Sequence, residues 1–322
     1  MKYIVTGATG HIGNNLVRLL LKNNEEVKVL VRREDDIAIK GLNCEKAVGN
    51  LNDLSFLEEQ IEENAIVIHS AGLIDITNKL VDELISVNFS LTVNLVQTCI
   101  KKKIRKFIYI SSTDAINIKE GNIVEPREFN LEGLDNYYAI SKAMASDYVL
   151  KTIKQGLLNG CIVCPSCVLG VNDFKVSSQG GVVKKQINKK WAFSMNGHYN
   201  FVDVENVVEG IYNASKRNTA PVYLLTGVDV TVHDLFETMF KVQNKQVRII
   251  SFGMFLVKIG VFFMPLYYKI TKKPPVFTKM TIDTITRNIT FEHDLASKDL
   301  DYKKTDFELL IKKTINWFSN NQ

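Results

Sequence analysis

The sequence lacks the features that mark nucleic-acid-binding proteins. It has no arginine-rich arm, no zinc-finger spacing and no RNA-binding signature, and its net charge of +5 is mild and spread over 322 residues. The basic run Lys101–Lys103 is typical of a solvated helix end, where cations suit the helix dipole. We therefore expect a small-molecule substrate and no nucleic-acid partner.

Cysteine is sparse, and its spacing does not predict a metal site. Cys161, Cys164 and Cys167 form a C-x-x-C-x-x-C pattern, but the first two lie in an apolar run that predicts a strand. Residues three apart on a strand point to opposite faces, and no His or Cys cluster elsewhere completes four ligands. We expect buried thiols and no metal.

A signal peptide is also missing from the sequence as given. The chain begins Met1-Lys2, and an apolar strand starts at Tyr3, which leaves no room for one. Five cysteines suit a reducing compartment. We therefore expect a cytoplasmic location.

One long hydrophobic run is present. Residues Phe252–Ile270 are about long enough to cross a bilayer. However, Lys258 lies in the first half of the run and Pro265 interrupts it. The run therefore predicts a pocket wall, an interfacial helix or an oligomer contact. A peripheral membrane contact through residues 252–270 and a homodimer both stay open.

The first half of the sequence alternates apolar strands with amphipathic helices. This alternation predicts βαβ units and hence an α/β fold with a doubly wound parallel sheet of the Rossmann type. Strands are expected at residues 3–6, 27–31, 65–70, 106–111 and 161–164, and helices from the glycine loop to about 22, at 81–102 and at 136–155.

After about residue 170 the pattern loosens. Residues 171–181 predict a loop over the site. We expect residues 1–170 to form the dinucleotide-binding domain, and residues 171–322 mainly a smaller α/β substrate-binding lobe. Segments at about 198–225 are expected to return to the Rossmann core. The later elements are expected as strands at 200–203 and 222–225 and helices at 204–215, 231–243 and 305–318.

A glycine-rich loop follows the first expected strand. Gly7, Gly10 and Gly13 are spaced G-x-x-G-x-x-G between a strand and a helix, which is the context of a dinucleotide fingerprint. The glycines allow a tight turn, close approach of a pyrophosphate and packing of helix on sheet. The helix N-terminus offers N–H groups to the phosphates. Cofactor contacts are expected from Thr6, Gly7, Thr9, Gly10, His11, Ile12 and Gly13.

Tyr138 and Lys142 form a Y-x-x-x-K pair. Four residues make just over one helical turn, so the two side chains share a helix face. A lysine ammonium one turn away favours the phenolate and lowers the tyrosine pKa from about 10. Tyr138 can then exchange a proton with a substrate hydroxyl or carbonyl near neutral pH. Tyr137 cannot act this way, because Ser141 stands four residues after it.

The glycine loop and the Tyr-Lys pair, about 125 residues apart, resemble the extended branch of the short-chain dehydrogenase/reductase superfamily. That branch includes nucleotide-sugar epimerases and dehydratases, dihydroflavonol reductases and 3β-hydroxysteroid dehydrogenases. The resemblance implies that Tyr138 is the acid/base, that Ser112 orients the substrate carbonyl, and that Lys142 also binds the nicotinamide ribose. Ser111 and Thr113 are the alternatives to Ser112 if the alignment slips by one.

Other segments resemble the same superfamily position by position. Asn50-Leu51 matches a segment that contacts adenine, although Asn50 replaces the usual Asp. Ser70-Ala71-Gly72 matches a turn that lies along the cofactor, with His69 before it in a structural role. Pro165-Ser166 matches a segment beside the nicotinamide. Ala115 stands where 4,6-dehydratases have a catalytic Glu, which disfavours dehydration.

The end of the second expected strand predicts which cofactor binds. It reads Leu30-Val31-Arg32-Arg33, with no acid for a ribose 2′-hydroxyl. A guanidinium group suits a 2′-phosphate, which it can grip through two hydrogen bonds. Glu34, Asp35 and Asp36 follow and could neutralise part of this charge. We expect NADP rather than NAD.

The predicted function is NADP(H)-dependent reduction of a carbonyl of a hydrophobic small molecule, as in dihydroflavonol reductases and 3β-hydroxysteroid dehydrogenases. The alternative is an NAD-dependent nucleotide-sugar epimerase, which uses the same residues for transient oxidation. A third possibility is a non-catalytic dinucleotide sensor, which the Tyr-Lys pair argues against. The substrate preference is based on the aromatic and aliphatic residues of the second half: Phe252, Phe255, Phe262, Phe263, Met264, Tyr267 and Tyr268.

Overall fold

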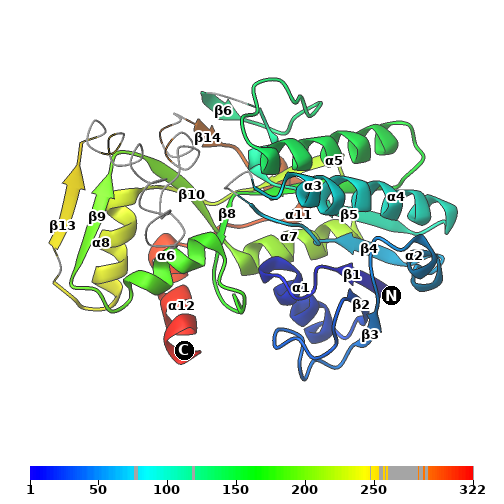
Figure 1. Ribbon diagram of the computed structural model, residues 1–322, viewed down its shortest axis with the longest axis horizontal. Coiled ribbons are helices and arrows are strands. Elements are labelled where there is room, and N and C mark those ends of the chain that lie inside the picture. The colour runs from blue at the N-terminus through cyan, green and yellow to red at the C-terminus, as the bar shows by residue number, and fades with distance from the viewer. Residues whose placement is uncertain are drawn as a thin grey trace.

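A seven-stranded, wholly parallel sheet forms the centre of the larger lobe (Figure 1). The computed structural model describes residues 1–75, 79–117, 120–246, 248–253, 257, 259, 282, 286 and 289–321. In spatial order the sheet contains β11 (Val222–Leu225), β7 (Gly160–Pro165), β5 (Lys106–Ile110), β4 (Ile66–His69), β1 (Lys2–Thr6), β2 (Glu26–Val31) and β3 (Glu45–Val48). The order reverses between β1 and β4, where doubly wound sheets bind ligands at their carboxyl ends. The predicted fold class is confirmed.

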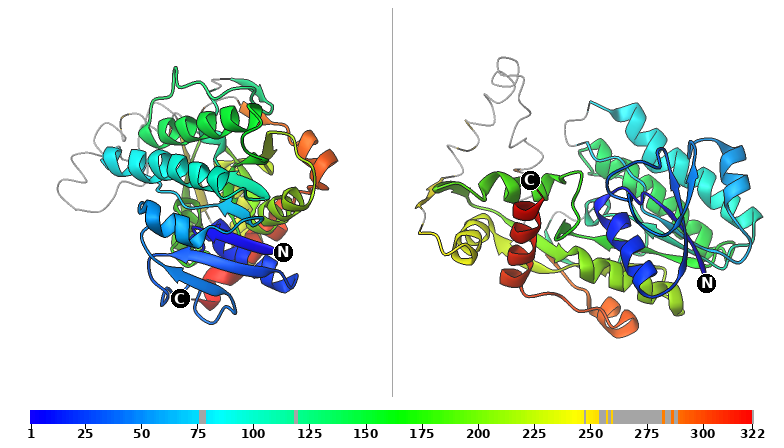
Figure 2. Two further views of the ribbon diagram at one scale, coloured as in Figure 1. Left: turned by 90° about the vertical axis from the view of Figure 1, so that its right-hand side faces the viewer. Right: turned by 90° about the horizontal axis from the view of Figure 1, so that it is seen from below.

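Helices cover both faces of this sheet, which explains why its strands are continuous apolar runs. One face carries α1 (His11–Lys22), α7 (Val204–Lys216) and α11 (Asp294–Leu300). The other carries α2 (Leu54–Gln60), α4 (Leu91–Lys101) and α5 (Tyr137–Lys154). Figure 2 shows α4 and α5 side by side.

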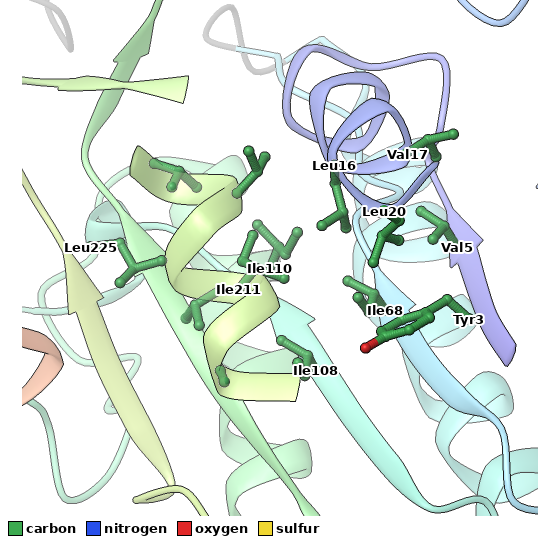
Figure 3. Close-up of a cluster of buried hydrophobic side chains, with 14 of the residues drawn as sticks. Tyr3, Val5, Leu16, Val17, Leu20, Ile68, Ile108, Ile110, Ile211 and Leu225 are labelled. Atoms are coloured by element: carbon green, nitrogen blue, oxygen red, sulfur yellow. The ribbon is translucent and has the colours of Figure 1, made fainter. Parts of the chain in front are cut away.

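The core under α1 and α7 is built from alternate strand residues (Figure 3). Tyr3 and Val5 point to this side of β1, whereas Ile4 between them belongs to the cluster on the opposite face. Leu16 and Leu20 of α1 are one helical turn apart and fully buried against these strand residues. Both elements thus present the periodicity that their sequences predict.

The second lobe has its own small sheets and its own apolar cluster. A three-stranded sheet has the order β12 (Val228–Thr231), β10 (His198–Asp203) and β8 (Cys167–Leu169), and β9 (Trp191–Met195) pairs with β13 (Arg248–Phe252). A further pair joins β6 (Gly121–Ile123) to β14 (Ile289–Phe291). The helices of this lobe are α6 (Ser178–Gln186), α8 (Val232–Val242) and α12 (Phe307–Asn320).

Two predicted elements differ from the structure. The helix expected at 81–102 is divided into α3 (Val81–Leu84), the π-helical segment η1 (Ile85–Ser90) and α4. The loop expected at 171–181 ends earlier, because Ser177 accepts a hydrogen bond from the Gly180 amide and starts α6 at Ser178. Such side-chain capping fixes a helix start even when the following sequence has weak periodicity.

The cysteine prediction can be compared with the sheet. Cys161 and Cys164, both on β7, pack into the clusters on opposite faces of the sheet, as their spacing predicts.

Within the described residues no helix is both long and apolar enough to span a membrane. Most of the run 252–270, including Phe255, Phe262, Phe263, Met264, Tyr267 and Tyr268, lies outside the described residues.

Candidate active site

The glycine loop brings the carboxyl ends of β1 and β4 into contact. Gly7 adopts a φ of +73°, and a Cβ there would lie 2.4 Å from the Ala71 amide nitrogen. A Cβ on Gly13 would lie 2.2 Å from the Gly7 carbonyl oxygen. Gly10 is the N-cap of α1, and this helix start has neither a side-chain cap nor an acid in its first turn. The loop therefore fits a dinucleotide pyrophosphate, since it offers backbone N–H groups without competing anions.

His69 fixes the geometry behind this loop. Its Nδ1 lies 2.7 Å from Thr6 Oγ1 and its Nε2 lies 3.0 Å from Thr92 Oγ1. Burial lowers the pKa of His69 to about 3, so the ring is neutral. The Ala71 amide donates to Thr6 Oγ1 at 3.3 Å. The histidine is thus structural and holds the turn Ser70–Gly72 against β1.

Asn88, in the π-helical segment, connects this turn to α5. Its side chain accepts a hydrogen bond from the Leu73 amide at 2.8 Å and donates to the Leu73 carbonyl at 2.9 Å. It also donates to Ser141 Oγ of α5 at 2.9 Å. A Cβ on Gly72 would approach Lys142 Nζ to 3.3 Å. The cofactor-side turn and the predicted catalytic helix are therefore in contact.

Ser112 and Tyr138 come together at the carboxyl end of β5. Ser112 caps the short 3₁₀ helix η2 (Thr113–Ala115) by accepting a hydrogen bond from the Asp114 amide at 3.1 Å. Asn136 caps α5 by accepting from the Ala139 amide at 2.7 Å, which places Tyr138 in the first helical turn. The Ser112 hydroxyl donates to the Asp114 carboxylate at 3.4 Å, and it lies close enough to the Tyr138 phenol to act on its pKa. Both side chains are buried, with Tyr138 8% exposed.

The expected lowering of the Tyr138 pKa does not occur in this state. Burial raises the pKa of Tyr138, the negative charge of Asp114 raises it further, and the nearby Ser112 hydroxyl opposes both effects. Lys142 is not aimed at the phenol, because its Nζ donates to the Ile110 carbonyl at 2.8 Å and lies 4.9 Å from the centroid of the Tyr109 ring. Sharing a helix face does not make two side chains meet.

Lys142 is itself perturbed by its surroundings. Burial lowers the pKa of its ammonium to about 8, because moving the charge out of water disfavours it. Its position between Gly72 and the carbonyl end of β5 suits a donor to a ribose hydroxyl. Near neutral pH the ammonium is largely protonated, although it releases its proton more readily than a surface lysine.

The two arginines after β2 are not equivalent. Arg33 grips Asp35 through two hydrogen bonds of 2.9 Å each. Arg32 is exposed, and its side chain makes no ion pair or hydrogen bond with the described residues. The neighbouring acids therefore neutralise the charge of Arg33, and the Arg32 guanidinium stays available for a 2′-phosphate.

Asn50 and Leu51 lie at the end of β3, next to the end of β2, because the Gly49 amide donates to the Val31 carbonyl. The Asn50 side-chain oxygen accepts from the Asn52 amide at 3.0 Å, and Leu51 packs on the core. The Asn50 side-chain nitrogen, which has no partner within the described residues, is therefore suited to contact a base.

Lys175, from the segment after β8, was not among the predicted site residues. Its Nζ donates to Thr9 Oγ1 at 2.7 Å and pairs with Asp36 at 3.1 Å. The same segment is attached to α1, since both His11 and Asn15 bond to the Val171 carbonyl at 3.0 Å. A cation of the second half thus reaches the glycine loop, which no local sequence pattern indicates.

A cavity of about 70 Å³ opens beside η2. Its apolar wall is formed by Ile116, Ile123, Ile289 and Phe291. Its polar side includes Thr113, Asp114, Cys167, His198 and Tyr199, together with Ser166, which donates to Asn200 Oδ1 at 2.7 Å. No Lys or Arg lines it within the described part of the chain. Ser166 follows the buried Pro165 at the end of β7, so this predicted segment borders the cavity.

A larger hollow of about 490 Å³ lies elsewhere, between residues 127–131 and the C-terminal half of α5. It contains none of the predicted site residues. The chemistry-bearing side chains gather at the carboxyl edge of the sheet instead, and we assign the candidate active site there.

Comparison with known proteins agrees with this arrangement. Residues 4–223 match the model of the 3-beta hydroxysteroid dehydrogenase/isomerase family. The chain is 31% identical over 245 residues to sterol demethylase protein B of Methylococcus capsulatus, covering 74% of this chain and 73% of that protein. It is 31% identical over 220 residues to a putative dihydroflavonol 4-reductase of Synechocystis, covering 67% of this chain and 63% of that protein.

Solved structures share the fold at lower identity. The UDP-glucuronic acid 4-epimerase of Bacillus cereus, solved with UDP-glucuronic acid and NAD, superposes with a TM-score of 0.76 at 18% identity, and the alignment covers 100% of both chains. At this identity the similarity establishes the fold and leaves the substrate open.

Proposed function

Because the chain belongs to the 3-beta hydroxysteroid dehydrogenase/isomerase family, within the extended short-chain dehydrogenase/reductase superfamily, we propose that it reduces a carbonyl of a hydrophobic small molecule with NADPH. The chain is an NAD(P)-dependent enzyme by family, which sets the sensor interpretation aside. The cofactor preference and the substrate class form the proposal. It rests chiefly on the grouping of Ser112, Tyr138 and an apolar cavity wall at one sheet edge.

The protein side chains have separate tasks in this reaction. Bound NADPH would supply the hydride. Ser112, whose hydroxyl lies beside Tyr138, would orient the substrate oxygen so that the phenol can donate its proton to it. The raised pKa of Tyr138 favours the protonated form that reduction requires. Lys142 would hold the ribose from its place beside Gly72.

The lining of the cavity supports an apolar substrate over a nucleotide sugar. A diphosphate needs cations, preferably arginine forks, yet the described lining has none and carries Asp114. Of the arginines in the second half, Arg217 pairs with Asp301, and Arg248 begins β13. Arg287 lies outside the described residues. An apolar carbonyl compound would bind by area removed from water, roughly 25 cal/mol per Å².

The cofactor preference is tested by binding. We expect NADPH to bind about ten- to a hundredfold more tightly than NADH, because a charge-assisted hydrogen bond contributes roughly 1.5–3 kcal/mol. Arg32→Ala should remove most of that preference. Arg33→Ala is the matched control and should change it less, since Arg33 is paired with Asp35. Equal affinities in the unaltered protein would contradict the proposal.

The substrate class is tested by turnover. Apolar ketones and aldehydes should be compared with UDP- and dTDP-sugars, and the nucleotide released from denatured protein should be identified. Reduction of apolar carbonyls with exchangeable NADPH is expected. Tightly retained NAD with turnover of a nucleotide sugar alone would favour the epimerase.

A further inference from the structure

The β9–β13 pair has one covered face and one uncovered face. α8 packs against both strands, and Ala192 and Ile249 face it as part of the third core cluster. The opposite face carries four large apolar side chains, which we call the outer face. They are Trp191, Phe193, Ile250 and Phe252, with 48%, 45%, 37% and 37% of their surfaces exposed.

The outer face is continuous because the strands are in register. Trp191 lies opposite Arg248 and Phe193 opposite Ile250 in parallel pairing, so these side chains emerge on the same side. Ring centroids are 4.6 Å apart for Trp191 and Phe193 and 5.2 Å apart for Phe193 and Phe252. Scattered apolar residues on a surface are ordinary, whereas a contiguous patch marks an interaction site.

The charged residues that adjoin the two strands of the outer face in sequence are cations. Lys189 and Lys190 stand exposed directly before Trp191, and the exposed Arg248 begins β13. Residues 183–200 and 238–253, which contain both strands, hold seven Lys or Arg and no Asp or Glu, although Lys241 pairs with Glu308 and Lys184 lies over the Phe318 ring. The sequence stays free of carboxylates as far as residue 282. A binding partner should therefore be apolar at its centre and anionic around it.

We propose that the outer face binds an anionic lipid surface. Trp and Phe side chains are suited to the headgroup level of a bilayer, and neighbouring Lys and Arg attract anionic headgroups. Each such cation near the surface adds attraction that salt weakens. The strands lie at the opposite end of the molecule from β3 (Figure 1), so this contact leaves the glycine loop open. It is independent of the proposed reaction.

The test is sedimentation of the full chain with phosphatidylcholine vesicles, with and without phosphatidylglycerol. Binding to the anionic vesicles, weakened by salt, is expected. Trp191→Thr with Phe193→Thr should reduce partitioning about tenfold or more, because two large side chains lose apolar area. Ile37→Thr with Leu157→Thr, which removes two exposed apolar side chains elsewhere, should not reduce it.

The electrostatic contribution to vesicle binding is tested with a second pair of double variants. Lys189→Glu with Lys190→Glu should reduce binding to anionic vesicles about tenfold or more. Lys303→Glu with Lys304→Glu makes the same change in net charge at another exposed site and should leave most of the binding. Circular dichroism melting checks that each variant is folded.

Three results would overturn the proposal. One is failure of the unaltered protein to bind anionic vesicles. Another is a dimer in analytical ultracentrifugation that Trp191→Thr with Phe193→Thr converts to a monomer, which would make the outer face a contact between copies. The third is binding of a single-stranded oligonucleotide, lost on Lys189→Glu with Lys190→Glu, without vesicle binding.

Discussion

Tyr138 stands among groups that keep its hydroxyl protonated. Its burial and the carboxylate of Asp114 both raise its pKa. In the proposed reduction the residue begins as an acid, so this state suits the direction of the reaction. The neighbouring Ser112 hydroxyl partly opposes this rise in pKa.

Removing that hydroxyl should abolish proton transfer but leave the fold. We expect Tyr138→Phe to lower kcat about 10²- to 10⁴-fold, since general acid catalysis is typically worth that much. NADPH affinity, measured by fluorescence, should be nearly unchanged. Tyr137→Phe is the matched control, because Tyr137 is 42% exposed. Equal activity of Tyr138→Phe and the unaltered protein would disprove the assignment.

Lys142 should give a pH-dependent stability difference. Its folded pKa is lowered from 10.5 to about 8, so between these values the unfolded chain holds a proton that the folded chain has lost. Stability from this residue therefore rises with pH through that window. In the absence of cofactor, Lys142→Met should be more stable than the unaltered protein at pH 7, by up to about 3 kcal/mol.

Urea unfolding at pH 7, 8, 9 and 10 measures this difference. The advantage of Lys142→Met should shrink steadily toward pH 10, and the variant should lose catalytic activity at every pH. A difference that stays constant across the series would show that the ammonium is solvated in the folded state.

At the level of elements, the sequence predicted those helices, strands and turns whose formation depends on residues close together in the chain. The glycine loop, α1 and α5 follow from spacing and apolar periodicity over a few turns. β6 and β14 were missed because three residues are too few to show a strand pattern. β9 and β13 were missed because they lie outside the alternation of strands and helices that identified the larger sheet. The bond between Lys175 and Thr9 joins residues 166 positions apart, and a single sequence gives no signal for it.

We expect the segment between β8 and α6 to make a separate contribution to cofactor binding. We expect Lys175→Met to weaken the binding of NADPH and NADH equally, about three- to tenfold, because the lost cation contacts the glycine loop and is partly exposed. Arg32→Ala should weaken only NADPH. Titration of both variants with both cofactors separates the two effects. A selective loss of NADPH binding in Lys175→Met would instead assign that lysine to the 2′-phosphate.

At the scale of the whole molecule, the seven-stranded sheet includes residues from both sides of the predicted domain boundary at residue 170. β11 comes from residues 222–225 and pairs with β7 at the sheet edge. α7, which packs on the core side chains of β5 and β7, also comes after residue 170 in the sequence. The expectation that segments near 198–225 return to the larger lobe can therefore be tested directly.

A fragment of residues 1–170 should not fold cooperatively. It would expose β7 as an apolar edge and uncover the side chains under α7, such as Ile108 and Ile110. Thermal melting by circular dichroism should show no sharp transition, and NADPH should not bind. A cooperative fragment that binds NADPH would show that the first 170 residues are an independent domain.

The pairing of β6 with β14 has a consequence for how the enzyme matures. Ile123 pairs with Phe291 and Gly121 with Ile289, and three of these residues line the cavity beside η2. During synthesis from the N-terminus, β1, α1 and α5 emerge long before residue 289, and closing so long a loop carries an entropic cost. The larger sheet is therefore complete once β11 has been made, whereas the wall of the proposed substrate cavity is completed last. A nascent or truncated chain that includes β11 but stops before residue 289 should have its nucleotide site before it has any substrate selectivity.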